Sequence, residues 1–247
     1  MIPELIEPWL PFFVSLAALL LAHRLTTRVI HHLCFRLTHS STFSFYAYAL
    51  LTWPGTVIHE FSHWLMAIIL RVPVGLPNLV PDRDQGALGW VMHARTDLFR
   101  QSLIGAAPLL FGSGLVAGLA YYAFSLPIPE IELNGLGSIL PLLEAFPAVF
   151  DVPYALFYLY FLFAIANGMM PSPTDYASWP LLFLLIALSA TLVFALVGVP
   201  EIPTVVSEWT LQLVSWLTFS FLITSIIDAG LLLFIWPLER LLWTIGW

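Results

Sequence analysis

Long runs of apolar residues, separated by short polar connections, set the pattern of this chain. A helix needs about 20 mostly apolar residues to cross the hydrocarbon core of a bilayer. Six stretches are candidate membrane helices, at about 8–22, 44–70, 102–126, 153–174, 177–199 and 208–237. The first of them is short unless it continues into the Arg-bearing stretch that follows.

The pattern predicts an all-α polytopic membrane protein with about six transmembrane helices in a single membrane domain, residues 1–247. Within it we expect an N-terminal helix with an interfacial segment (1–43), a core (44–200) and a C-terminal transmembrane helix (201–247). The connection at 72–98 differs from the others. It places the turn cluster 82–86 between two short apolar runs, and this pattern is typical of a β-hairpin.

The composition agrees with a membrane protein. The chain is 60% hydrophobic and 9% charged, whereas soluble domains are about 25% charged. So little polar surface cannot cover a water-soluble globule of this length. The net charge of −7 offers no basic patch and excludes nucleic acid as a partner. The single cysteine, Cys34, excludes an internal disulfide framework and a cysteine-based zinc site.

Arginine placement predicts a topology. One side would carry Arg71, Arg83, Arg95, Arg100 and Arg240, and the other Arg24, Arg28 and Arg36. The positive-inside rule then makes the 71–100 side cytoplasmic, in a multi-pass protein of the cell membrane. Alternatively, His23–His39 is an interfacial amphipathic helix, and its three arginines carry little topological information.

An H-E-x-x-H sequence, residues 59–63, lies inside the second apolar stretch. Residues four apart lie on the same face of a helix, so the His59 and His63 imidazoles can bind one Zn²⁺. Glu60 can then take a proton from a water activated by the metal. The alternative is a set of buried polar residues bonded to neighbouring helices. Three adjacent ionisable groups at membrane depth favour the functional interpretation.

A hydrolytic zinc site needs a third protein ligand and an open position. His93 and Asp175 are the main candidates for that ligand, with Asp228, inside the last apolar stretch, as a lesser one. His93 has an alternative as a strand residue that faces solvent. Asp175 has one as a loop residue that caps the next helix. Three further carboxylates belong to the hairpin region and are expected to be solvated: Asp82, Asp84 and Asp97.

Three features together resemble the site-2 protease family of intramembrane zinc metalloproteases. After the H-E-x-x-H helix comes a helix with a Gly and a Pro, Gly105 and Pro108. Then follows Asn167-Gly-Met-Met-Pro-Ser-Pro-Thr-Asp175, similar to the family's N-x-x-P-x-x-x-x-D-G motif. The proline lies four residues after the Asn instead of three, and Tyr176 stands where the family has Gly. The resemblance covers about 44–200, and a short β-hairpin after the first of these helices is also a family feature.

The resemblance implies residue roles. His59, His63 and Asp175 would be zinc ligands, one Zn²⁺ per chain, and Glu60 would be the general acid and base. Asn167 would be a substrate clamp or oxyanion donor, with a buried Asn that bonds another helix as its alternative. The 44–200 core would be a metalloprotease core without a nucleotide-sensing insertion, with its active site nearer the cytoplasmic face.

The implied function is an intramembrane zinc endopeptidase whose substrates are single-span membrane proteins within the lipid bilayer. Two alternatives remain at this point. One is a non-catalytic scaffold or chaperone of the same fold, and the other is a metal or proton transporter. The sequence has no inverted repeat, which counts against transport.

Overall fold

The chain folds into helices over the residues that the computed structural model describes, 9–126, 144, 146–197 and 204–244. The helices are α2 (Trp9–Thr38), α3 (Ser41–Leu51), α4 (Trp53–Ile69), α5 (Leu98–Phe124), the 3₁₀ turn η2 (Phe146–Asp151), α7 (Ala155–Gly168), α8 (Trp179–Val197) and α9 (Thr204–Thr244). The predicted all-α class is confirmed for these ranges. Residues 1–8, at the start of the predicted N-terminal part, and residues 127–143 and 198–203 lie outside these ranges.

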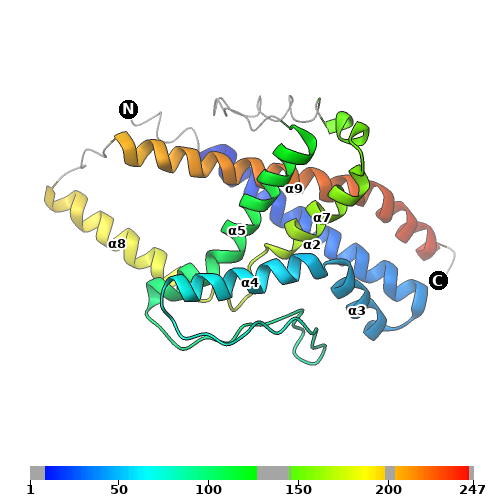
Figure 1. The fold of residues 1–247 in the computed structure, drawn as a ribbon, viewed down its shortest axis with the longest axis horizontal. Coiled ribbons are helices and arrows are strands. Elements are labelled where there is room, and N and C mark those ends of the chain that lie inside the picture. Colours follow the sequence, from blue (N-terminus) through cyan, green and yellow to red (C-terminus); the bar gives the residue numbers. More distant parts are fainter. Residues whose placement is uncertain (1–8, 127–143, 145, 198–203, 245–247) are drawn as a thin grey trace.

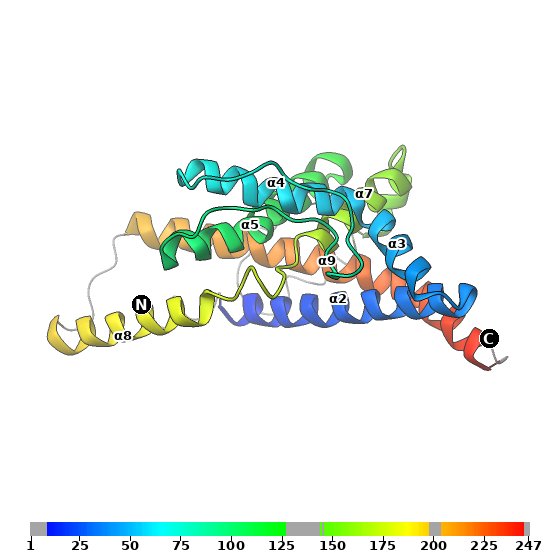
Figure 2. The same cartoon turned by 90° about the horizontal axis from the view of Figure 1, so that it is seen from below.

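Two long helices, α2 and α9, lie side by side along the molecule and form the base for the rest (Figures 1 and 2). The rings of Phe12 and Phe221 meet with their centroids 5.7 Å apart, and further along both helices Arg36 Nε lies 3.2 Å from Glu239 Oε1. Helix α4 packs against α5 and α7, which in turn pack on α9. Helix α8 projects away from the other helices in both views.

Three helices of the described part are long and apolar enough to cross a membrane: α2, α5 and α9, with 30, 27 and 41 residues. These helices suggest a membrane protein. The predicted number of six spans is not supported. One reason is that α7 ends at Gly168 instead of about residue 174, because Pro171 and Pro173 follow and cannot continue a helix.

The predicted helix 44–70 is two helices. Helix α3 ends at Leu51, and α4 begins at Trp53 with Pro54 in its first turn. Proline has no N–H for the residue four earlier and its ring clashes with that carbonyl, so a helix starts there more readily than it passes through. The structure thus breaks the predicted helix at Thr52.

The first predicted helix, at 8–22, does continue into the Arg-bearing stretch that follows, because α2 reaches Thr38. Arg24, Arg28 and Arg36 therefore lie within a helix. The positive-inside rule compares the numbers of Lys and Arg in the loops on the two sides of the membrane, so these three arginines do not enter that comparison. The topology and the choice of membrane stay predictions.

The predicted β-hairpin at 72–98 does not form strands. This connection runs out and back alongside α4 (Figure 2) and is paired only at isolated antiparallel bridges, Val74 with His93, Asn78 with Trp90 and Asp82 with Ala87. Three prolines in the outgoing half interrupt the ladder, because a proline cannot donate a backbone hydrogen bond.

Candidate metal centre

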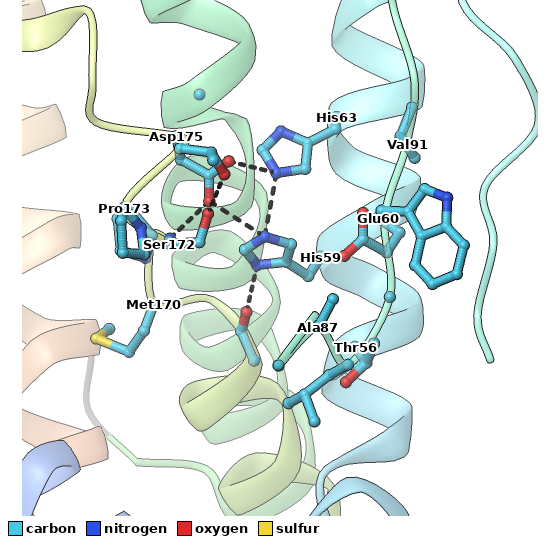
Figure 3. Close-up of a pocket in the computed structure, with 18 of the residues that line it drawn as sticks. Thr56, His59, Glu60, His63, Ala87, Val91, Met170, Ser172, Pro173 and Asp175 are labelled. Carbon is cyan, nitrogen blue, oxygen red and sulfur yellow. Dashed lines mark hydrogen bonds and ion pairs between the residues drawn. The ribbon is translucent and has the colours of Figure 1, made fainter. Parts of the chain in front are cut away.

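Helix α4 places His59 and His63 one turn apart, on the face that looks toward the loop after α7 (Figure 3). Their Nε2 atoms lie 3.1 Å from each other. Both side chains are largely buried, and His63 is 8% exposed. The pair that the H-E-x-x-H spacing predicts is therefore present as two imidazoles with converging nitrogens.

Backbone carbonyls orient both rings. His59 Nδ1 lies 2.6 Å from the carbonyl oxygen of Gly168, and His63 Nδ1 lies 2.8 Å from that of Ile104. A carbonyl oxygen only accepts, so each Nδ1 carries the hydrogen and donates it. Each Nε2 is left with its lone pair directed at the site, which is the arrangement that metal-binding histidines use.

Asp175 reaches the imidazoles from the segment between α7 and α8. Its Oδ2 lies 3.4 Å from His59 Nε2, and its Oδ1 lies 3.2 Å from His63 Nε2. The backbone N–H of Ser172 donates to Oδ2 at 2.6 Å and holds the carboxylate in place. The carboxylate is thus directed at the imidazoles and does not cap α8, which begins at Trp179.

The spacing of these atoms fits one tetrahedral cation. Ligand atoms about 2.0–2.2 Å from a tetrahedral zinc are about 3.3–3.6 Å apart. The two Nε2 atoms lie 3.1 Å apart, and the Asp175 carboxylate places Oδ2 3.4 Å from the first and Oδ1 3.2 Å from the second, so each contact is close to that value. Two neutral imidazoles and one carboxylate are also a donor set that zinc accepts. His59, His63 and Asp175 could therefore hold a metal ion.

Glu60 lies beside the imidazole pair, on the side that faces the 87–91 segment (Figure 3). It is 6% exposed, and its carboxylate interacts electrostatically with His59, His63 and Asp175. Nothing among the described residues donates a hydrogen bond to that carboxylate. A buried carboxylate with free lone pairs next to a metal position can accept a proton from water there.

Two glycines allow the elements of the site to approach closely. A Cβ at Gly105 of α5 would lie 2.0 Å from the carbonyl oxygen of Asp175. A Cβ at Gly55 of α4 would lie 1.8 Å from the carbonyl oxygen of Ala164 and 3.0 Å from Gly168 Cα. Gly55 is thus the point where α4 crosses α7, a role that we did not predict. In the sequence, Gly55 is only a glycine within an apolar stretch, and this does not reveal which helix packs against it.

A cavity of about 880 Å³ connects these groups. Its walls come from α2, α3, α4, α5, the end of α7 and the 85–93 and 170–175 segments. Besides the metal-binding group and Glu60, polar side chains of His23, Thr27, Tyr48 and Asn167 line it. The cavity has room for water and for a segment of extended chain next to the metal position.

The other predicted candidates lie outside the metal-binding group. His93 Nδ1 donates to the carbonyl of Ala94, next to it in the chain. Asp82 accepts hydrogen bonds from the backbone N–H groups of Asp84 and Gln85 in a turn. Asp97 caps α5, and the bond that it accepts from the N–H of Arg100 lowers the pKa of its exposed carboxyl.

Asn167 lies on the cavity wall with its amide already bonded. Its Nδ2 donates to the carbonyl of Phe163 and to Asp228 Oδ1, both at 3.0 Å. Its Oδ1 accepts from His23 Nδ1 at 2.9 Å. Both N–H groups are engaged within the protein, so donation to an oxyanion would require one of these bonds to break. A substrate role for Asn167 stays a prediction.

Comparisons of the chain with family models, with curated proteins and with solved structures found no match.

Proposed function

We propose that the protein is an intramembrane zinc-dependent endopeptidase of the site-2 protease type. The observation that carries this proposal is the convergence of two imidazole nitrogens, from His59 and His63, with the Asp175 carboxylate at contacts of 3.1, 3.2 and 3.4 Å. Two imidazoles and one carboxylate are a donor set that zinc accepts. The buried Glu60 carboxylate beside them and the cavity around them give further support.

The residues divide the chemistry between them. His59, His63 and Asp175 would hold the zinc, which when bound polarises a scissile carbonyl and makes water more acidic. Glu60 takes a proton from the attacking water as the new C–O bond forms. It then gives that proton to the amine nitrogen as the C–N bond breaks, so that one water is consumed for each peptide bond.

A substrate helix must unwind to be cut, because its peptide bonds are shielded by hydrogen bonds. Within the 72–98 connection, the backbone of Trp90 exchanges hydrogen bonds with that of Asn78, and the carbonyl of Met92 accepts one from the N–H of Gly75. Val91 lies between Trp90 and Met92 and lines the cavity. Its backbone N–H and carbonyl form no backbone hydrogen bond with the described residues. This edge supports binding of an extended segment by main-chain pairing.

The substrates would be single-span membrane proteins, cleaved within the lipid bilayer. The three long apolar helices support a multi-pass membrane protein. Placement in the cell membrane, with the site nearer the cytoplasmic face, remains part of the proposal and rests on the four arginines of the 71–100 side.

Replacement of Glu60 by Gln tests the proposal directly. Glu60→Gln keeps the shape of the side chain and removes the proton acceptor, so we expect zinc content near one per chain and a loss of cleavage of about 10²-fold or more. The assay uses the detergent-solubilised protein and a single-span peptide with a central Gly-Pro step. Glu208→Gln, an exposed Glu of α9, is the matched control and should cleave normally.

Other results would decide against the endopeptidase. Full cleavage by Glu60→Gln with zinc bound would remove Glu60 from the mechanism. No zinc in the wild type and no cleavage would favour a scaffold or chaperone. Zinc that exchanges readily and crosses vesicle membranes would favour a transporter.

A further inference from the structure

A chain of buried polar side chains joins three helices behind the metal centre. His23 of α2 donates to Asn167 of α7, and Asn167 donates to Asp228 of α9. Asp228 is 0% exposed, and its Oδ2 has no hydrogen-bond partner among the described residues. The chain is separate from the proposed reaction, which uses none of its three members.

Asp228 is a costly residue for packing alone. A carboxyl group in the middle of an apolar helix loses its hydration, and an unpartnered oxygen recovers none of that loss. A whole buried polar group of this kind can often be replaced by apolar residues of similar volume without loss of stability, whereas removal of one partner leaves the other unsatisfied. A role beyond stability is therefore expected to act through the group that Asp228 contacts, the side-chain amide of Asn167.

What Asp228 holds is the last turn of α7. Asn167 is followed by Gly168, where α7 ends, and the carbonyl of Gly168 accepts the Nδ1–H of His59 at 2.6 Å. The orientation of that carbonyl depends on the rotation of this turn. Gly168 packs backbone to backbone on Gly55 of α4, which sets how closely the two helices approach. Asp228 and His23 hold Asn167 from two other helices and so restrict the rotation of the turn.

We infer that Asp228 is a positioning residue for the metal centre, which acts through Asn167 and the Gly168 carbonyl on the ring of His59. This inference rests on the proposed role of His59, His63 and Asp175 as a metal site. Partners of this kind, one step behind a ligand, commonly change metal affinity by about 10–100-fold when they are removed.

The test measures metal binding and not proteolysis. Cobalt is the probe, because Co²⁺ occupies zinc sites and its visible absorption reports the geometry of its ligands. Asp228→Leu removes the hydrogen-bond acceptor at similar volume, and Asp228→Asn keeps an acceptor for Asn167. Ser220→Ala is the control, since it removes another buried bond of α9, from Ser220 Oγ to the Ser113 carbonyl at 2.7 Å.

We expect Asp228→Leu to bind Co²⁺ about 10-fold or more weakly than the wild type, with an altered visible spectrum. Asp228→Asn should restore both, and Ser220→Ala should change neither. His23→Phe provides a second variant if Asp228→Leu does not fold. It leaves the Asn167 oxygen without its donor, and it should weaken cobalt binding in the same direction.

Two results would overturn the inference, and they are distinguishable. If the wild type binds Co²⁺ and Asp228→Leu binds it equally well with the same spectrum, Asp228 has no positioning role, whatever its effect on thermal stability. If Asp228→Leu does not fold and His23→Phe binds Co²⁺ as the wild type does, the positioning role of Asp228 is likewise excluded. If the wild type binds no Co²⁺, the metal site itself is refuted, and the role of Asp228 with it.

Discussion

Asp175 reaches the imidazoles because its backbone lies directly against α5 at Gly105. A Cβ at this position would lie 2.0 Å from the Asp175 carbonyl oxygen and 2.9 Å from its carbonyl carbon. These are backbone atoms, which cannot rotate away as the end of a side chain can. Any larger residue at 105 must therefore move the Asp175 segment away from α5.

The first prediction is that Gly105→Ala weakens metal binding. The added methyl group should shift Asp175 by enough to lose its place near His59 and His63, with a loss of zinc affinity of about 10-fold or more, or about 1.4 kcal/mol. Zinc affinity of the detergent-solubilised protein, measured by competition with a chelator, checks this.

The same helix provides the control. Nothing lies within 4 Å of a Cβ placed at Gly114 of α5, so Gly114→Ala should bind zinc normally. Since Ala favours a helix over Gly, it should also raise the free energy of unfolding by about 0.5–1 kcal/mol. Equal zinc affinity in the two variants would show that the Gly105 contact does not position Asp175.

The sequence alone predicted the part of the site that one helix carries, because the spacing of His59, Glu60 and His63 determines their relative positions on that helix. An α-helix has about 3.6 residues per turn, so a spacing of four places His59 beside His63 in any such helix, and the pattern alone locates Glu60 between them. The groups that orient the rings are the carbonyls of Gly168 and Ile104. Every residue has a carbonyl, so no residue type marks these acceptors in the sequence.

The ends of the helices depend on signals that hydropathy does not contain. The apolar run predicted a first helix at 8–22, but α2 continues through three arginines to Thr38. Arginine favours a helix nearly as well as leucine, and the stretch has no internal Gly or Pro to stop it. The helix is followed by His39, with a left-handed φ of 53°.

Helices α4 and α7 cross at two glycines, and this crossing sets the distance from His59 to the Gly168 carbonyl. A Cβ at Gly55 would meet the Ala164 carbonyl oxygen at 1.8 Å, and one at Gly168 would meet the Gly55 carbonyl carbon at 2.4 Å. The helices touch backbone to backbone, so neither side can yield to an added methyl group.

The second prediction is that Gly55→Ala separates α4 from α7 and destabilises the whole protein. Overpacking of this kind costs about 1–3 kcal/mol or more, and separation also stretches the bond from His59 to Gly168. Thermal unfolding of the metal-free protein in detergent measures the loss. Gly230→Ala in α9, with nothing within 4 Å of the new Cβ, should unfold at or above the wild-type temperature. Identical unfolding of the two variants would contradict the tight crossing.

The candidate metal-binding group joins parts of the molecule that are far apart in the chain. His59 and His63 belong to α4, and Asp175 belongs to the segment between α7 and α8, beyond α5 and α7 in sequence. A metal that binds all three ties this segment to α4 in the folded state only, because the unfolded chain does not hold the ligands together. Metal binding is then linked to the stability of the whole chain.

The third prediction is that removal of the metal lowers the unfolding temperature. At a free zinc concentration of about 100 times the dissociation constant, a single site adds about 2.7 kcal/mol to the free energy of unfolding. For a chain of this length, that corresponds to a shift of about 5–10 °C. Thermal unfolding in detergent, with zinc, with a chelator and after zinc is restored, should show this shift and its reversal. His63→Ala leaves only two ligands, so its unfolding temperature should respond to neither treatment. An equal response in His63→Ala would place the stabilising metal elsewhere in the chain.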